Sequence, residues 1–235
     1  MKTLDQPTLR PARHKGPPLG IVASVFVLLF IAGLYPVTAF GGKPFFPGPG
    51  EPLDVIVAFF QARPSAVLFC AALQFGAAIP LGILTAALVS QLRFLGVRAA
   101  GANIALFGGF ATAFNMIVSS SILWTMSYPG IAQDSNLIQV LYRLSFALGG
   151  PGFSVPFGLL IAGVSVTAWF GKLLPKWLII PGLLIAAIGE LSWLDILWPK
   201  ALFLIPLTRF PGFVWTIAAG FALPNTISRE KAEQE

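Results

Sequence analysis

Long apolar segments separated by short turns constrain this chain more than any other feature of its sequence. A helix needs about 20 predominantly apolar residues to cross the hydrocarbon core of a bilayer. Six segments approach or exceed this length, at about 20–40, 65–90, 99–124, 153–170, 177–194 and 203–223. The sequence therefore predicts an all-α membrane protein, a bundle of six transmembrane helices within residues 20–224.

Composition agrees with this class and bounds the number of domains. Of the 235 residues, 56% are hydrophobic and 10% are charged, against about 25% charged in soluble domains. Six spans with short loops use almost the whole chain, which predicts one domain. Residues 1–19 are basic and proline-containing, so we expect a disordered cytoplasmic tail. Residues 225–235 are expected to form a second cytoplasmic tail. Val37-Thr38-Ala39 resembles a signal-peptidase site, but the length of the preceding apolar stretch favours an uncleaved first span.

Basic residues predict the orientation. Cytoplasmic loops carry an excess of Lys and Arg. With six spans, ten basic residues fall on the side of the termini: Lys2, Arg10, Arg13, Lys15, Arg93, Arg98, Lys172, Lys176, Arg229 and Lys231. Five fall on the other side or near it: Lys43, Arg63, Arg143, Lys200 and Arg209. Both termini are therefore expected in the cytoplasm.

The segment from Leu137 to Phe170 is too long for one crossing. As a straight helix it would measure about 51 Å, against a hydrocarbon core of about 30 Å. Gly149-Gly150-Pro151-Gly152 is the expected place of interruption, and Asp134 is expected to cap the helix that starts before it. We therefore predict a broken or re-entrant amphipathic helix over about 136–148, before the fourth span.

Smaller features complete the expected architecture. The Gly- and Pro-rich residues 41–52 predict an ordered or semi-rigid outer loop, and 53–60 a short interfacial helix. Gly101, Ala105, Gly109 and Ala113 recur every four residues, which predicts close approach of one neighbouring helix. The sixth helix is expected to become regular only after Pro211.

Ionisable residues beside the last two spans are the main functional candidates. Charged groups at membrane depth are costly and need partners. Glu190 and Arg209 fall at similar depths on consecutive spans, which predicts a buried ion pair, with Arg143 as the rival partner of Glu190. The same outer half contains further polar candidates for a ligand site: Asp195, Asn115, Ser119 and Ser120.

The sequence contains no pattern that predicts catalytic chemistry, a metal site or a cofactor. Cys70 is the only cysteine and His14 the only histidine, so the usual zinc ligand sets cannot be assembled. The net charge of +6 is scattered singly beside apolar spans, which indicates membrane orientation rather than binding of nucleic acid.

Three stretches in the second half carry a resemblance to known sequences. They are Ala147-Leu148-Gly149-Gly150-Pro151-Gly152-Phe153, Leu174-Pro175-Lys176-Trp177-Leu178, and Pro206-Leu207-Thr208-Arg209-Phe210-Pro211-Gly212-Phe213-Val214-Trp215. Over about residues 100–224 the chain resembles a group of uncharacterised bacterial multi-pass membrane proteins with about six helices. This resemblance implies a bacterial plasma membrane and brings no activity or ligand.

Three functions remain open from the sequence. The first is an accessory or structural membrane component that meets a protein partner or a second copy of itself, with the lipid bilayer as its surroundings. The second is a protein that binds or transports a small molecule or lipid in a pocket of the outer half. The third, an enzyme acting on lipid through Glu190 or Asp195, lacks a histidine or a positioned nucleophile.

Overall fold

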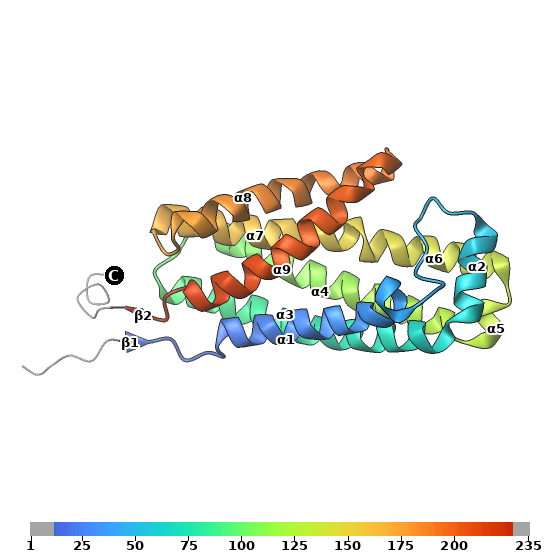
Figure 1. The fold of residues 1–235 in the computed structure, drawn as a ribbon. Coiled ribbons are helices and arrows are strands. Elements are labelled where there is room, and N and C mark those ends of the chain that lie inside the picture. Colours follow the sequence, from blue (N-terminus) through green and yellow to red (C-terminus); the bar gives the residue numbers. More distant parts are fainter. Residues whose placement is uncertain (1–11, 228–235) are drawn as a thin grey trace, which may run out of the picture.

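The protein, described here by a computed structural model over residues 12–227, is an elongated bundle of helices (Figure 1). Residues 1–11 and 228–235, which belong to the two predicted tails, lie outside this description. The elements in chain order are β1 (Ala12–Arg13), α1 (Leu19–Leu34), η1 (Tyr35–Val37), η2 (Ala39–Gly41), α2 (Leu53–Ala62), α3 (Pro64–Phe94), α4 (Ala100–Met126), α5 (Pro129–Ala132), α6 (Ser135–Gly149), α7 (Pro151–Gly171), α8 (Lys176–Leu191), η3 (Ser192–Ile196), η4 (Pro199–Phe203), α9 (Leu204–Ala222) and β2 (Thr226–Ile227).

Six helical segments are long and apolar enough to cross a membrane, which agrees with the predicted class. They run alternately between two ends of the bundle (Figure 1). Each contacts the next along the chain, in the order α1, α3, α4, α7, α8 and α9, and α9 contacts α1. The six helices therefore form a closed ring, and α7 also contacts α9 across it.

Both described ends of the chain lie at the same end of the bundle, which we call the terminal end (Figure 1). There β1 pairs with β2 in antiparallel register, Ala12 opposite Ile227. The His14 ring bonds to Ser90 Oγ at 3.0 Å and lies 5.4 Å from the ring of Phe94. Residues 12–18 thus differ from the free tail expected from their composition, because contacts with α3 and with the other end of the chain hold them in place.

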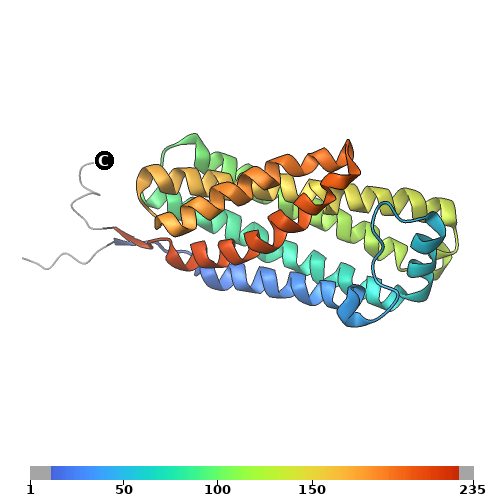
Figure 2. The ribbon, with the colours of Figure 1, turned by 45° about the horizontal axis from the view of Figure 1, so that its top comes forward.

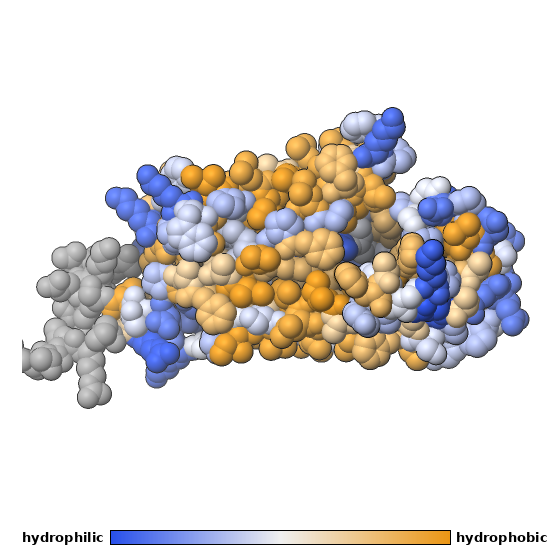
Figure 3. All heavy atoms as spheres, viewed as in Figure 1, coloured by the Kyte–Doolittle hydropathy of each residue, from blue (hydrophilic) through white to orange (hydrophobic). Residues whose placement is uncertain are grey.

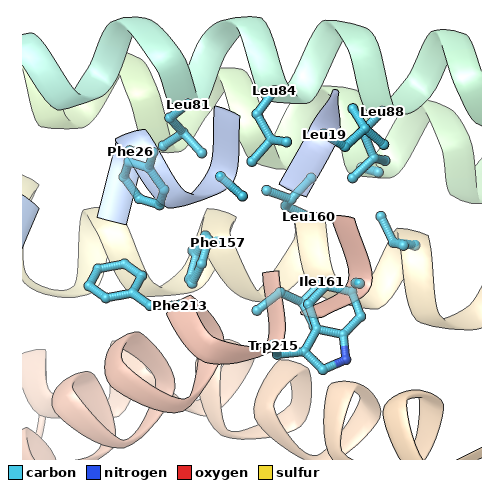
Figure 4. Close-up of a cluster of buried hydrophobic side chains, with 14 of the residues drawn as sticks. Leu19, Phe26, Leu81, Leu84, Leu88, Phe157, Leu160, Ile161, Phe213 and Trp215 are labelled. Atoms are coloured by element: carbon cyan, nitrogen blue, oxygen red, sulfur yellow. The ribbon is translucent and has the colours of Figure 1, made fainter. Parts of the chain in front are cut away.

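The main core lies between α1, α3, α7 and α9 and is rich in aromatic rings (Figure 4). Phe213 of α9 stands edge-on to Phe26 at 5.3 Å and to Phe30 at 4.9 Å between ring centroids. Such geometry adds roughly 0.5–1.5 kcal/mol per pair beyond the burial of area. Trp215, in the middle of α9, is buried and donates Nε1 to the Leu178 carbonyl at 2.7 Å.

The outer surface of the bundle forms an apolar belt between two more polar ends (Figure 3). Large apolar side chains such as Leu28, Phe107 and Val214 are more than 60% exposed. The five remaining tryptophans, at positions 124, 169, 177, 193 and 198, are all exposed near the ends of helical segments. Amphipathic rings prefer the membrane–water interface, so their positions agree with the predicted spans.

Helices α4 and α7 approach one another through small residues. A Cβ on Gly163 would lie 2.6 Å from Ala105 N, and one on Gly108 would lie 2.5 Å from Pro156 O. Gly109, however, faces Thr85 of α3. Residues four apart on an α-helix point in directions that differ by about 40°. The predicted stripe therefore contacts two neighbouring helices, α7 and α3, instead of one.

The end opposite the termini is a separately packed unit, which we call the cap and which comprises residues 35–63 and 127–149. With the adjoining ends of α3 and α4 it encloses a second core, including Phe59, Phe60 and Tyr142. Tyr142 donates its hydroxyl to the Pro47 carbonyl at 2.7 Å, and Gln61 donates to the Ala132 carbonyl at 3.1 Å. The cap extends well beyond the turn between α8 and α9 (Figure 2).

Arg63 binds one side of the segment between α1 and α2, residues 35–52, which we call the loop of the cap. Its Nη2 donates to the carbonyls of Pro36 and Gly41 at 2.8 Å, and its Nη1 to those of Gly42 and Lys43 at 3.1 Å. The predicted short helix is present as α2, which runs two residues further than expected and ends directly before this arginine.

The prediction for the sixth span is wrong in one respect. α9 is regular from Leu204 and continues through Pro211. Pro206 falls in the first turn, where no intrahelical N–H bond is lost. The irregular backbone comes earlier, in η3 and η4.

Candidate functional site

The junction between α6 and α7 brings together three of the predicted site residues, Asn115, Ser119 and Arg209. The helix is interrupted at Gly150, whose φ of −88° and ψ of −101° are not helical, so the predicted break is confirmed. Pro151 starts α7 without an N–H to donate. In Figure 1, α6 continues in the general direction of α7 towards the far end of the cap. At its start, Asp134 accepts from Asn136 N and Leu137 N, as the predicted cap requires.

Two backbone carbonyls at this junction lack their usual helical partners. The Gly149 carbonyl is at the C-terminus of α6, and the Gly152 carbonyl would accept from residue 156, which is Pro156 and has no N–H. Both receive side-chain donors from neighbouring spans. Asn115 of α4 donates its amide to the Gly152 carbonyl at 2.5 Å, and Arg209 of α9 donates Nη2 to the Gly149 carbonyl. The junction is thereby tied to the ring on both sides.

A pair of serines adds to this attachment one turn further into the cap. Ser119 Oγ of α4 donates to the Ser145 carbonyl of α6 at 2.9 Å, and Ser145 Oγ lies 3.3 Å from the Ser119 carbonyl. Both serines are buried. Hydrogen bonds of this kind between spans contribute about 0.6 to 2 kcal/mol each.

Arg209 lies between aromatic rings at this junction. Its guanidinium carbon is 4.6 Å from the centroid of Phe153 and 5.4 Å from that of Phe30. Its Nε is buried and has no hydrogen-bond partner in residues 12–227. The Gly149 carbonyl is at the C-terminus of α6, where the helix dipole favours a cation.

The predicted ion pair between Glu190 and Arg209 is not formed. Glu190 Oε1 is buried without a partner in the described part of the chain, and no carboxylate there lies within 4.0 Å of Arg209. Glu190 lies against the small face of α7, since a Cβ on Gly158 would be 3.1 Å from its Oε1. Arg209 contacts Phe153, about 140° around the same helix. The two charges therefore meet different faces of α7.

The remaining predicted residues lie apart from the junction. Asp195 is in η3, with a buried Oδ1 that has no partner in residues 12–227, and Arg143 is exposed on α6. Ser120 lines a groove of about 410 Å³ between α3 and α4. A second groove, of about 370 Å³, opens in the cap; its lining residues are Phe60, Gln61, Pro64, Pro129, Ala132 and Gln133.

Sequence reasoning missed two residues that organise this end of the protein, Ser145 and Arg63. Ser145 carries no distinctive signal, because a lone serine in an apolar helix is common. Arg63 could have been found: the neighbouring loop is rich in proline, so it offers more carbonyl acceptors than N–H donors, and an adjacent arginine is a natural donor.

Comparisons with protein families, curated proteins and solved structures find no match to this chain. In residues 12–227 no group of three His, Cys, Asp or Glu side chains is placed to hold a metal ion. The site consists of hydrogen bonds from side chains of α4 and α9 to the backbone of α6 and α7.

Proposed function

We propose that this protein is a non-catalytic accessory component of a bacterial plasma membrane, which meets a protein partner through its cap. The observation that carries the proposal is that the cap has its own core and projects beyond the α8–α9 turn (Figure 2). Its loop is held by the four carbonyl bonds of Arg63. A rigid surface loses little conformational entropy on association.

The polar residues of the outer half support a structural role. Asn115, Ser119 and one nitrogen of Arg209 bond to backbone carbonyls at or near the junction. The binding or transport alternative has one observation in its favour, the remaining N–H donors of Arg209. The enzyme alternative, which depends on Glu190 or Asp195, gains no support, because Glu190 Oε1 and Asp195 Oδ1 have no hydrogen-bond partner in the described residues. The contact between His14 and Ser90 lies at the terminal end, away from both carboxylates.

In the proposed orientation both termini are cytoplasmic and the cap is outside. The ten-to-five distribution of basic residues is its basis. We expect a reporter fused after Glu235 to give a cytoplasmic signal, and one inserted between Gly48 and Pro49 to give an extracytoplasmic signal. The opposite pair of signals would reverse the orientation and turn the cap towards the cytoplasm.

The partner is tested by purification from native membranes in a mild detergent. We expect a protein to copurify at fixed stoichiometry with the wild type. Gln133→Arg places a charge at the exposed edge of the cap groove and should lower the retained partner by about tenfold or more, since burial of an unpaired charge costs several kcal/mol.

Lys200→Gln, an exposed change on η4 away from the cap, is the matched control and should retain the partner. The proposal is wrong if no protein copurifies, or if Gln133→Arg and Lys200→Gln retain the same amount.

A further inference from the structure

Arg209 has more donors than the described protein uses. A guanidinium carries five N–H donors, and in residues 12–227 the hydrogen bond to the Gly149 carbonyl is the one it forms. Nε is buried and unbonded. A charge at membrane depth in this state is costly unless it finds a counter-charge. The cation–π contacts with Phe153 and Phe30 offset part of this cost.

The surroundings of Arg209 favour an anion from outside the chain. Glu190 faces another side of α7, and no carboxylate of residues 12–227 comes within 4.0 Å. The side chain of Arg209 remains partly exposed, and it bonds from α9 to the last residue of α6. The molecule is hollowed between the α8–α9 turn and the cap (Figure 3).

The depth of Arg209 points to the phosphate of a membrane lipid. Trp193 and Trp198 are exposed at the α8–α9 turn, where rings mark the interface. Arg209 is five residues into α9, about 8 Å along the axis from Leu204. The interfacial layer on each side of the hydrocarbon core is about 5–8 Å thick. Lipid phosphates are therefore within reach of a long side chain at this level.

The adjoining surface can also hold acyl chains. Ile31 of α1 is 42% exposed, and Phe210 and Val214 of α9 are 45% and 70% exposed. α1 and α9 are in contact, and Phe30, which precedes Ile31, packs against Phe213 and the guanidinium of Arg209. The three exposed apolar side chains therefore lie on the two helices that meet at Arg209. We propose that Arg209 binds the phosphate of a phospholipid, with the acyl chains lying along α1 and α9. The site goes beyond the accessory role and does not depend on it.

The test uses the purified full-length protein in a neutral detergent and measures bound lipid by native mass spectrometry. The probes are phosphatidylglycerol, diacylglycerol with the same acyl chains, and inorganic phosphate. We expect phosphatidylglycerol to bind about tenfold more tightly than diacylglycerol, because its phosphate can accept one or two charge-assisted hydrogen bonds from Arg209. Arg209→Gln should abolish this preference, and Arg143→Gln, an exposed arginine of the cap, should leave it unchanged.

The possible outcomes separate the sources of the anion. Equal binding of the two lipids, or a preference that survives Arg209→Gln, overturns the proposal. Inorganic phosphate that competes with phosphatidylglycerol at equal concentration shows that the site takes a free anion, which overturns the assignment to a lipid. If Arg209→Gln does not fold, Arg209→Lys replaces it in the test. A weaker preference for phosphatidylglycerol in Arg209→Lys supports recognition of the phosphate by the planar guanidinium, and an unchanged preference contradicts it.

Discussion

Gly163→Ala is expected to destabilise the protein by about 2–3 kcal/mol, seen as a lower Tm in detergent. The new Cβ would lie 2.6 Å from Ala105 N and 2.9 Å from Ala105 Cβ, and would also meet the carbonyl of Gly101. Backbone atoms cannot move aside as the end of a side chain can, so α4 and α7 would have to separate. Overpacking of a close-packed interior typically costs about 1–3 kcal/mol.

Gly76→Ala is the matched control in another span. No atom lies within 4 Å of a Cβ at this position of α3. Alanine in a helix is preferred over glycine by roughly 0.5–1 kcal/mol, so Tm should stay the same or rise slightly. If Gly163→Ala and Gly76→Ala melt alike, the close approach of α4 and α7 is incorrect.

The sequence predicts the spans of this fold well because length and hydropathy decide them almost alone. The six predicted segments correspond to six helices long and apolar enough to cross a membrane. Short connections explain why α3 contacts α4, α7 contacts α8 and α8 contacts α9, whereas the long segments 35–63 and 127–149 separate the other neighbours and only tertiary packing brings α9 to α1. The break at Gly150 was also predictable, because two glycines and a proline stand where one helix would be too long. The cap was not predictable as a unit, since its core joins side chains from segments as distant as Phe59 and Tyr142.

Three of the seven candidate site residues meet at one junction, and the predicted ion pair between Glu190 and Arg209 is not formed. Asn115, Ser119 and Arg209 do converge on one junction. Sequence gives the depth of a residue along a span, whereas an ion pair also depends on the rotation of each helix about its axis. Glu190 turns to Gly158 and Arg209 to Phe153, so similar depths on adjacent spans did not bring them together.

Arg63→Gln is expected to lower the stability of the protein by about 3 kcal/mol and to loosen the loop of the cap. The arginine satisfies the carbonyls of Pro36, Gly41, Gly42 and Lys43 with two nitrogens. A hydrogen bond to a charged group contributes about 1.5–3 kcal/mol. The two bonds from Nη1 are exposed to solvent and contribute less than the two from the better buried Nη2, so the expected loss of stability is smaller than four times this value. Glutamine is shorter and cannot span the same acceptors.

Two measurements distinguish loss of this clamp from a general effect of charge. Chymotrypsin should cut after Phe40 or Phe45 faster in Arg63→Gln than in the wild type, because both side chains are exposed on the released loop. Arg143→Gln removes an exposed arginine of the same cap and should change neither Tm nor cleavage, as expected for a solvated surface charge. The Tm and the cleavage rate of Arg63→Lys should lie between those of Arg63→Gln and the wild type, since an ammonium keeps the charge but lacks the planar, forked donors of a guanidinium. Equal cleavage rates in Arg63→Gln and Arg143→Gln would mean that the loop is held by its packing on Phe59 and Phe60 instead of by the guanidinium.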